Sequence, residues 1–227
     1  MNSIGQLMFP RYAKFSPTLN GKIAITSKVL KLAYADHGPE IGLCFNGGKD
    51  SSVVLDLVRR FHESAKISTP VRPFFIKEKN DFPEITEFVK QTEERIGVTI
   101  RKVQSDSIKN AIEKIVEEDR IYSFFLGQRK TDPNCSNIKE FNLTSDDWVH
   151  AMRIFPILNW AYKDIWEYID ALELPVCSLY SKGYTSIGNT KNTIPNPRLY
   201  NPNTKQFAHA RELKDEAAER LSRIDVL

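Results

Sequence analysis

Residues 41–58 read IGLCFNGGKDSSVVLDLV, and this stretch decides the fold. The apolar run 41–45 is typical of a buried strand, and the run 53–58 is typical of a buried helix face. Between them, Gly47 and Gly48 allow a tight turn in which several backbone N–H groups converge on one anion. A helix that begins near Ser51 adds its positive N-terminal end at the same point. The stretch therefore predicts a strand, a nucleotide-phosphate loop and a helix.

The side chains of this loop indicate which kind of phosphate loop it is. Lys49 offers a point charge, and Asp50 offers a carboxylate that can hold magnesium. The loop of kinases and GTPases needs Gly-Lys followed by Ser or Thr and an earlier Gly, where this chain has Asp50 and Leu43. The pattern instead resembles the loop of ATP pyrophosphatases, which cut ATP between the α and β phosphates. An ordinary βα turn is the alternative, but it leaves the coincidence of GGKDS after a strand unexplained.

Length, charge and cysteine content limit the number of domains, the kinds of partner and the compartment that can be expected. At 227 residues, a single domain is expected over 1–227, with a core at 20–175 and a C-terminal segment at 176–227 that closes over substrate. A net charge of +3 is too small to indicate a nucleic-acid partner, and no apolar run approaches a membrane span. The three cysteines are scattered, which argues against zinc or iron–sulfur sites and suits a reducing compartment. Residues 22–35 are interpreted as a helix of the fold rather than a mitochondrial presequence, so the cytoplasm is expected.

Helix and strand patterns alternate along the chain after the first loop. Such alternation predicts an α/β fold, with a mostly parallel twisted sheet, helices on both faces and an irregular C-terminal extension. Ligands then lie at the carboxyl ends of the strands, where the strand order reverses. Residues 134–150 are expected to be a loop. The expected helices are 22–35, 51–63, 82–95, 107–118 and 162–172, and the expected strands are 41–45, 71–76, 98–103 and 122–126.

A second polar cluster, GQRKTDP at residues 127–133, closes one of these predicted strands. Arg129 can neutralise phosphate charge with its forked donors, and Asp132 could be a metal ligand opposite Asp50. Alone, the cluster is equally well interpreted as a surface salt-bridge loop. Beside the glycine loop, the phosphate-site interpretation is favoured.

Several motifs together resemble those of eukaryotic FAD synthetases, the FMN adenylyltransferases. They are NGGKD at 46–50, GxRxTDP at 127–133, RxxPxxxW at 153–160, LYxxGYTSIG at 179–188, NP at 196–197 and ERLSR at 219–223. The resemblance runs from about residue 40 to the C-terminus. It implies a PAPS reductase-like, adenine nucleotide α-hydrolase-like fold and transfer of AMP from MgATP to FMN, giving FAD and pyrophosphate.

The resemblance also implies roles for individual residues. The implied ATP-binding residues are Phe45, Asn46, Gly47, Gly48, Asp50, Ser51, Gly127 and Arg129, and the implied FMN-binding residues are Asp147, Trp148 and Arg153. The implied catalytic residues are Asn46, Asp50, Asp132, Arg220 and Arg223, of which Asp50 and Asp132 hold Mg²⁺. One departure bears on the flavin contacts, because the family often has an acid three residues before the tryptophan, where this chain has Ser145.

Simpler interpretations remain for single residues. Trp148 could be a core aromatic, and for Trp160 the core interpretation is favoured. Arg220 and Arg223, three residues apart, could share a solvated helix face. Cys177, among apolar residues, is expected to be a small buried hydrophobe.

Other functions need features that this sequence lacks. A PAPS reductase requires a reactive cysteine in a mobile C-terminal segment, and the last cysteine here is Cys177. A tRNA-modifying ATP pyrophosphatase or thiolase usually brings paired cysteines or a basic RNA-binding extension. A binding module without catalysis is opposed by the intact Asp50 and Asp132. A monomer that acts on small molecules, and that releases FAD or hands it to apo-flavoproteins, is expected.

Overall fold

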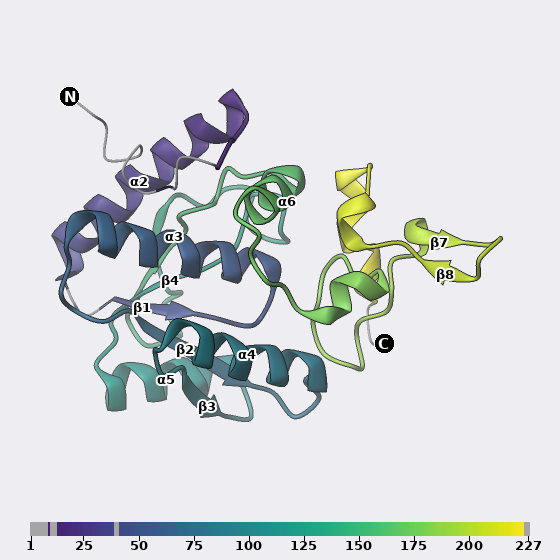
Figure 1. The fold of residues 1–227 in the computed structure, drawn as a ribbon. Helices are drawn as coiled ribbons and strands as arrows, with labels where there is room; N and C mark the ends of the chain where they lie inside the picture. Colours follow the sequence, from purple (N-terminus) through teal and green to yellow (C-terminus); the bar gives the residue numbers. More distant parts are fainter. Residues whose placement is uncertain (1–8, 10–12, 39–40, 225–227) are drawn as a thin grey trace.

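A single mixed sheet forms the centre of the protein (Figure 1). The computed structural model describes residue 9, residues 13–38 and residues 41–224. Within that part of the chain, the sheet has the strand order β3-β2-β1-β4-β6-β5, in which only β5 is antiparallel to its neighbour. The strands are Ile41–Cys44 (β1), Arg72–Lys77 (β2), Arg101–Gln104 (β3), Ser123–Phe125 (β4), Phe141–Leu143 (β5) and Met152–Ile154 (β6).

The strand order reverses between β1 and β4, which are neighbours in the centre of the sheet. From β1, the chain first moves outward through β2 to β3, then returns to the other side of β1 as β4. The loops that leave β1 and β4 therefore diverge in opposite directions, and a crevice opens between them. The two polar stretches singled out in the sequence, 46–51 and 127–133, follow these two strands.

Helices cover both faces of the sheet, as the sequence predicts. Side chains alternate between the faces of a strand, so Phe75 and Phe125 join the larger core cluster while Phe74 and Phe124 join the smaller one. The larger cluster packs against α2 (Pro17–His37), α3 (Lys49–Ala65), α4 (Pro83–Ile96) and α6 (Tyr162–Ala171), and the smaller against α5 (Ile108–Asp119). Figure 1 shows α3 and α5 on opposite sides of the strands. In the described ranges, no helix combines the length and apolarity that crossing a membrane requires.

Local sequence signals account for the ends of these helices. The Ser16 hydroxyl accepts a hydrogen bond from the backbone N–H of Leu19, and Ser107 does the same for Asn110, so α2 and α5 each begin at an N-cap serine. Gly97 ends α4 with a φ of 65°, in the left-handed region that glycine adopts at little cost. The predicted helices 51–63, 82–95, 107–118 and 162–172 are confirmed with small shifts, and the helix predicted at 22–35 begins earlier, at Pro17.

The prediction of a loop over 134–150 is wrong in part, because β5 lies within it. Phe141–Leu143 pairs antiparallel with β6, and Phe141 lies opposite Ile154. A three-residue edge strand among polar neighbours carries no alternating pattern, so its sequence gives no signal. The strand forms because the unpaired edge of β6 supplies backbone partners, and that edge exists only in the folded sheet.

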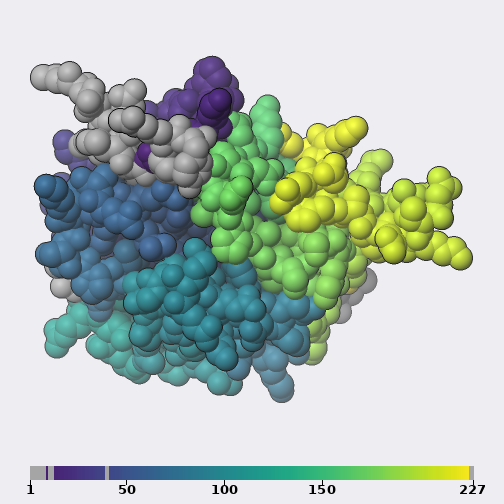
Figure 2. Space-filling model, in the orientation of Figure 1, coloured from purple at the N-terminus to yellow at the C-terminus, as the bar shows by residue number. Residues whose placement is uncertain are grey.

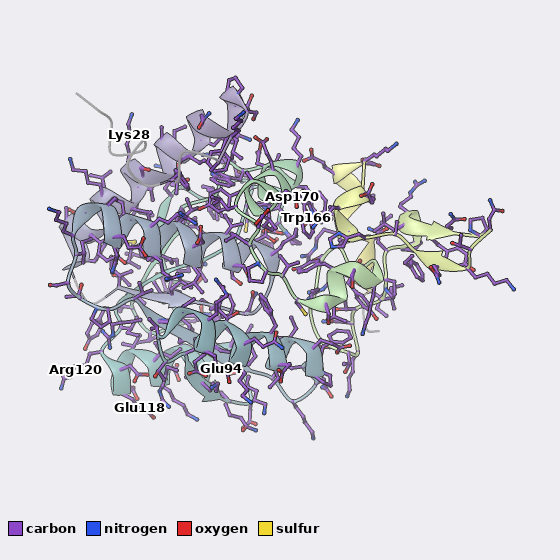
Figure 3. The ribbon with its side chains drawn as sticks, in the orientation of Figure 1. Lys28, Glu94, Glu118, Arg120, Trp166 and Asp170 are labelled. Carbon is purple, nitrogen blue, oxygen red and sulfur yellow. The ribbon has the colours of Figure 1, made fainter. Side chains whose placement is uncertain are left out.

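The C-terminal segment folds as short turns against the side of the sheet domain. Up to residue 224, where the description ends, it contains four 3₁₀ helices and a small hairpin. Figure 2 shows the hairpin protruding from the surface. Figure 3 shows Trp166 and Asp170 on the side of α6 that faces this segment. Arg211, a residue of the segment, forms an ion pair with Asp170 at 3.2 Å, and its guanidinium lies 5.6 Å from the centre of the Trp166 ring. The elements are η2 (Ser178–Lys182), η3 (Pro197–Leu199), β7 (Tyr200–Asn201), β8 (Gln206–Phe207), η4 (Ala210–Glu212) and η5 (Glu216–Ser222).

The two tryptophans Trp148 and Trp160 should differ in their effect on stability. Trp160 is 3% exposed and its indole N–H donates to the Thr26 hydroxyl at 3.2 Å, which confirms that it is a core aromatic. We expect Trp160→Ala to lower the free energy of unfolding by about 3–5 kcal/mol, since it leaves a large cavity. Trp148→Ala removes a half-buried ring and should cost only about 1 kcal/mol. Urea titration of both variants measures the difference, and equal losses would contradict these placements.

Candidate active site

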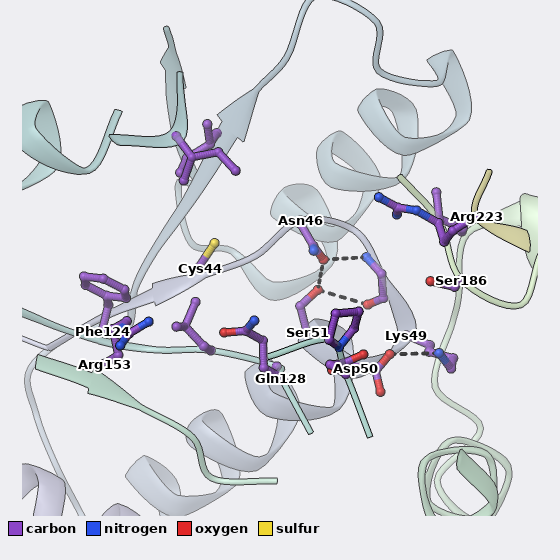
Figure 4. A pocket seen from close by; sticks show the side chains of 18 of the residues that line it. Cys44, Asn46, Lys49, Asp50, Ser51, Phe124, Gln128, Arg153, Ser186 and Arg223 are labelled. Carbon is purple, nitrogen blue, oxygen red and sulfur yellow. Dashed lines mark hydrogen bonds and ion pairs between the residues drawn. The ribbon is translucent and has the colours of Figure 1, made fainter. Parts of the chain in front are cut away.

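The phosphate loop has the conformation that its sequence predicts. Gly47 has a φ of 73°, which favours glycine, and the backbone then enters α3 at Lys49. The Asn46 side-chain oxygen accepts hydrogen bonds from the Gly48 N–H at 3.0 Å and from the Ser51 hydroxyl at 2.7 Å (Figure 4). These bonds hold the turn closed, with the N-terminus of α3 at its end. The loop thus presents a helix terminus suited to an anion.

The loop after β4 packs directly on the phosphate loop. A Cβ atom at Gly127 would lie 2.8 Å from the Ser51 backbone nitrogen and 3.0 Å from the Asp50 carbonyl carbon. Both are backbone atoms that cannot move aside, so only glycine permits this approach. Gly127 therefore brings the GxRxTDP stretch against the phosphate loop, as expected from the reversal of strand order.

A cavity of about 640 Å³ opens beside the phosphate loop. Figure 4 shows Cys44, Phe124 and Arg153 on one side of the loop residues Asn46 and Ser51, and Arg223 on the other side. The predicted site residues that line the cavity are Asn46, Gly48, Asp50, Ser51, Gly127, Asp132, Trp148, Arg153, Arg220 and Arg223. Its apolar lining comes from Cys44, Ile76, Ile108, Ile112, Phe124 and Leu126. One cavity therefore joins an anion-binding end to an apolar end, which suits a ligand with both characters.

Four predicted residues lie elsewhere or act differently from what the sequence implied. Phe45 is fully buried in the core against Phe88, and Gly47 faces Ile85 and Val89 of α4, so neither residue is part of the cavity lining. Asp147 is 73% exposed and lies 3.6 Å from Lys109, outside the cavity. Its neighbour Trp148 lines the cavity, because consecutive residues of the turn point in different directions. Arg129 is 1% exposed and lies behind the cavity wall.

Arg129 and Lys49 belong to a buried network of four charges. The Arg129 Nε lies 2.8 Å from Asp50 Oδ1, and its Nη2 lies 2.6 Å from both carboxylate oxygens of Glu219. Lys49 Nζ lies 2.9 Å from Asp50 Oδ2 and 2.6 Å from Glu219 Oε1. The sequence predicts that Lys49 offers its charge to a phosphate, but in the structure its Nζ pairs with two carboxylates.

The two candidate metal ligands lie in different electrostatic surroundings. Burial disfavours the charged form of Asp50, but Lys49 and Arg129 outweigh burial and hold its pKa below the usual value. Burial raises the pKa of Asp132, and the nearby carboxylates of Asp50 and Glu219 add to this rise. A bound cation would relieve the repulsion at Asp132. Across the described ranges, no three His, Cys, Asp or Glu residues are grouped to hold a metal ion.

Two arginines of the C-terminal segment project into the cavity. Arg220 Nη1 donates to the Ser186 hydroxyl at 3.1 Å and lies 3.9 Å from Asp132 Oδ1. The Arg223 guanidinium lies on Gly188, where an added Cβ would come within 2.3 Å of it. Burial and the charge of Arg220 lower the pKa of Arg223, and no hydrogen bond or ion pair of its side chain appears in the described residues. Two adjacent cations with so little compensation suit an anionic ligand.

Arg153 and Trp148 line the other part of the cavity, near its apolar wall. Arg153 Nη2 donates to the Leu143 carbonyl at 2.8 Å, and its buried Nε has no hydrogen-bond partner within the described part of the chain. The residue itself lines the cavity, so its guanidinium charge lies beside the apolar wall.

Sequence reasoning missed three residues that hold the site together. Glu219 is 6% exposed and completes the buried charge network. The Tyr180 hydroxyl accepts a hydrogen bond from the Lys49 backbone N–H at 2.6 Å, and the Thr185 carbonyl accepts one from Lys49 Nζ at 3.2 Å. All three residues lie in motifs quoted above, but only their burial and contacts in the folded protein show that they hold Lys49 in place.

Comparison with known proteins assigns the family. The model of the phosphoadenosine phosphosulfate reductase domain family matches residues 40–195. A "Probable FAD synthase" of Schizosaccharomyces pombe is 33% identical over 213 residues, which cover 90% of this chain and 80% of the relative. The structure of yeast FAD synthetase in complex with FAD superposes with a TM-score of 0.82 at 25% identity, covering 97% of this chain and 95% of that one. The chain belongs to the phosphoadenosine phosphosulfate reductase domain family and, within it, to the FAD synthases.

Some relatives are much longer than the matched region. A "Probable FAD synthase" of Caenorhabditis elegans is 33% identical over 193 residues, which cover 82% of this chain but only 37% of the relative. The chain therefore spans little more than a third of that protein's length.

The contact between Arg223 and Gly188 gives a test of the cavity's cationic wall. We expect Gly188→Ala to displace the flexible guanidinium while leaving the melting temperature almost unchanged. We expect affinity for a nonhydrolysable ATP analogue to fall about threefold to tenfold by calorimetry, since the variant moves a cation of the cavity wall that is expected to bind phosphate. Gly21→Ala is the control, since no atom lies within 4 Å of the added methyl. Unchanged affinity in Gly188→Ala would remove Arg223 from the nucleotide site.

Proposed function

We propose that the protein is an FMN adenylyltransferase, which transfers AMP from ATP to the phosphate of FMN and releases FAD and pyrophosphate. The observation that carries this proposal is the single cavity in which the phosphate loop, two arginines and an apolar wall meet. FAD itself combines these characters, because it has two phosphates between two ring systems. Membership in the FAD synthase family supports the same reaction.

The reaction needs alignment and charge stabilisation rather than a general base. An oxygen of the FMN phosphate, already ionised near neutral pH, forms the new bond to the α-phosphorus of ATP. The bond from that phosphorus to the bridging oxygen breaks, and pyrophosphate leaves with the electron pair. Negative charge therefore builds on the leaving group, where the α3 N-terminus, Arg220 and Arg223 would stabilise it. This accounts for a cavity that has no histidine in its lining.

Asp50 and Asp132 would hold a magnesium ion together with phosphate oxygens. Magnesium prefers oxygen ligands, and both carboxylates line the cavity. When bound, the ion supplies positive charge to the phosphates. The network behind Asp50 keeps this carboxylate ionised and fixes its direction, since Lys49 and Arg129 contact its oxygens from inside the protein.

The apolar part of the cavity would bind the flavin ring. Trp148 would offer an aromatic face, and Arg153, which lines the same part of the cavity, would offer its guanidinium charge. Asp147 is left out of this part of the proposal because its carboxylate lies on the surface. Ser145 also lines the cavity, so the position where the family often carries an acid still faces the ligand.

The rival reductase function is opposed by the state of the cysteines. Cys135 and Cys177 are 4% and 1% exposed, and Cys44 lines the cavity wall beside apolar residues. Burial raises the pKa of Cys44 to about 12, so its thiol stays protonated and unreactive at neutral pH. A sulfonucleotide reductase needs the opposite, a thiolate that reaches the substrate.

The proposal extends to cellular context. A single copy would suffice, because residues of one chain line the cavity. A reducing compartment such as the cytoplasm fits three cysteines that are all free thiols. The product FAD would be released or handed to apo-flavoproteins.

The direct test is incubation of the purified protein with FMN and MgATP labelled at the α-phosphate. Label should appear in FAD, with one pyrophosphate released per FAD, because AMP carries the α-phosphorus. Parallel reactions offer transfer RNA as an alternative acceptor, or adenosine phosphosulfate with a dithiol reductant as an alternative substrate. Label transferred to RNA, or sulfite released from the sulfonucleotide, with no FAD formed would overturn the proposal.

The carboxylates should be required for turnover but not for folding. We expect Asp50→Asn and Asp132→Asn each to lower kcat by roughly a hundredfold or more, since metal-linked charge stabilisation contributes several kcal/mol. Circular dichroism should show an intact fold. Asp106→Asn, at an exposed position away from the cavity, is the control and should behave as wild type. Near-normal turnover in either site variant would exclude that residue from the metal site.

A further inference from the structure

A single carboxylate of the C-terminal segment reaches into the interior beside the phosphate loop. Glu219 Oε1 lies 2.6 Å from Lys49 Nζ, and both Glu219 oxygens lie 2.6 Å from Arg129 Nη2. All three side chains are almost completely buried, where ion pairs are poorly screened by solvent. Glu219 therefore connects the C-terminal segment to the two loops that form the phosphate end of the cavity.

Lys49 is fully occupied by this connection. An ammonium group has three N–H donors, and those of Lys49 have three acceptors: Asp50 Oδ2, the Thr185 carbonyl and Glu219 Oε1. Two of the three acceptors belong to the C-terminal segment. The Lys49 backbone N–H also donates to that segment, at the Tyr180 hydroxyl. Lys49 thus links the start of α3 to the C-terminal segment, and all three of its ammonium N–H groups already have acceptors.

The backbone of η5 links Glu219 to Arg220 and Arg223, so the position of Glu219 determines where the two arginines lie. A 3₁₀ helix has three residues per turn, so residues three apart lie on one face. Glu219 and Ser222 share the buried face of η5. Arg220 directly follows Glu219, and Arg223 is the residue at which η5 ends; both arginines line the cavity. Any rotation or displacement of η5 that frees Glu219 also moves both guanidinium groups.

Neighbouring hydrogen bonds fix η5 in the same place but do not replace the charge contact. The Thr185 hydroxyl donates to the Glu219 carbonyl at 2.6 Å, and Asn196 Nδ2 donates to the Ala218 carbonyl at 2.8 Å. These bonds hold the backbone of η5 to residues 185–196, which belong to the C-terminal segment itself. Glu219 joins η5 to both the phosphate loop and the loop after β4. Arg220 adds a longer contact to Asp132 in the loop after β4, at 3.9 Å, and Glu216 accepts a hydrogen bond from the Tyr162 N–H at the start of α6.

We propose that Glu219 is a positioning residue, which holds the C-terminal segment against the phosphate loop through Lys49 and Arg129 and so places Arg220 and Arg223 at the reacting phosphates. The inference rests on the proposed adenylyl transfer for its catalytic consequence. Its structural consequence, the attachment of η5, does not depend on the reaction.

Glu219→Gln tests the attachment because it keeps the shape and removes the charge. Trypsin cleaves after Arg220 and Arg223, and we expect cleavage at these sites to be at least about tenfold faster in the variant, because proteolysis follows the population of the opened segment. Glu212→Gln is the control, since Glu212 is an exposed acid of the same segment whose side chain has no recorded hydrogen bond or ion pair. Cleavage at the wild-type rate in Glu219→Gln would overturn the proposal.

Turnover distinguishes positioning from a general loss of stability. We expect Glu219→Gln to lower kcat about tenfold at saturating FMN and MgATP, well below the melting temperature. In an Arg220→Ala, Arg223→Ala background, the same substitution should change kcat less than about twofold, because the groups that it positions are gone. A tenfold loss that persists in this background would show that Glu219 acts by another route and would overturn the proposal.

A second variant and an independent readout cover the cases in which the first tests fail. If Glu219→Gln does not fold, Thr185→Val removes the hydroxyl bond to the Glu219 carbonyl without removing charge. It should accelerate the same tryptic cleavages by about threefold, and no acceleration would count against the proposal. If the wild-type protein makes no FAD, the proposed function fails while the cleavage experiment still decides whether Glu219 attaches the segment.

Discussion

The site depends on one buried arrangement of charges, in which Lys49 and Arg129 are each shared between Asp50 and Glu219. Two cations and two carboxylates balance within a few ångströms, so none of the four is left as an uncompensated buried charge, which would be costly. The residues come from the phosphate loop, the loop after β4 and the C-terminal segment. Their mutual attraction therefore fixes three chain segments that the sheet alone does not hold together.

This arrangement gives different roles to the charged residues: some stabilise the protein around the site, and others are left to interact with a ligand. Burial alone would lower the pKa of Lys49, but Asp50 and Glu219 outweigh it and hold the pKa above its usual value, so Lys49 stays a cation. On the cavity side, Arg220 and Arg223 have few partners. Burial and the nearby carboxylates raise the pKa of Asp132 above its usual value. Arg220, Arg223 and Asp132 therefore face the cavity with incomplete partners, which anions and a cation can complete, whereas Lys49 and Glu219 are already engaged in the buried network.

The fold explains why these segments meet. Because the strand order reverses between β1 and β4, the loops that follow them leave in opposite directions and open a crevice. Gly127 then allows the second loop to touch the backbone of the first. Residues of the C-terminal segment, among them Ser186, Arg220 and Arg223, line the same cavity. The apolar end of the cavity arises from side chains of the same strands and of α5, so one crevice serves both a phosphate and a ring system.

The sequence by itself determined the α/β fold, the phosphate loop and the cavity residues that lie in motifs, because glycine conformations, periodicity and loop chemistry are local properties. The same reasoning placed Trp160 in the core correctly, from its apolar neighbours. Only the tertiary structure decided that Lys49 and Arg129 pair with Glu219, and that Asp147 faces solvent. It also decided that Phe141–Leu143 forms a strand. Each of these outcomes depends on a partner far away in the chain, such as the β6 edge or the η5 carboxylate, and no local pattern records which distant group will be present.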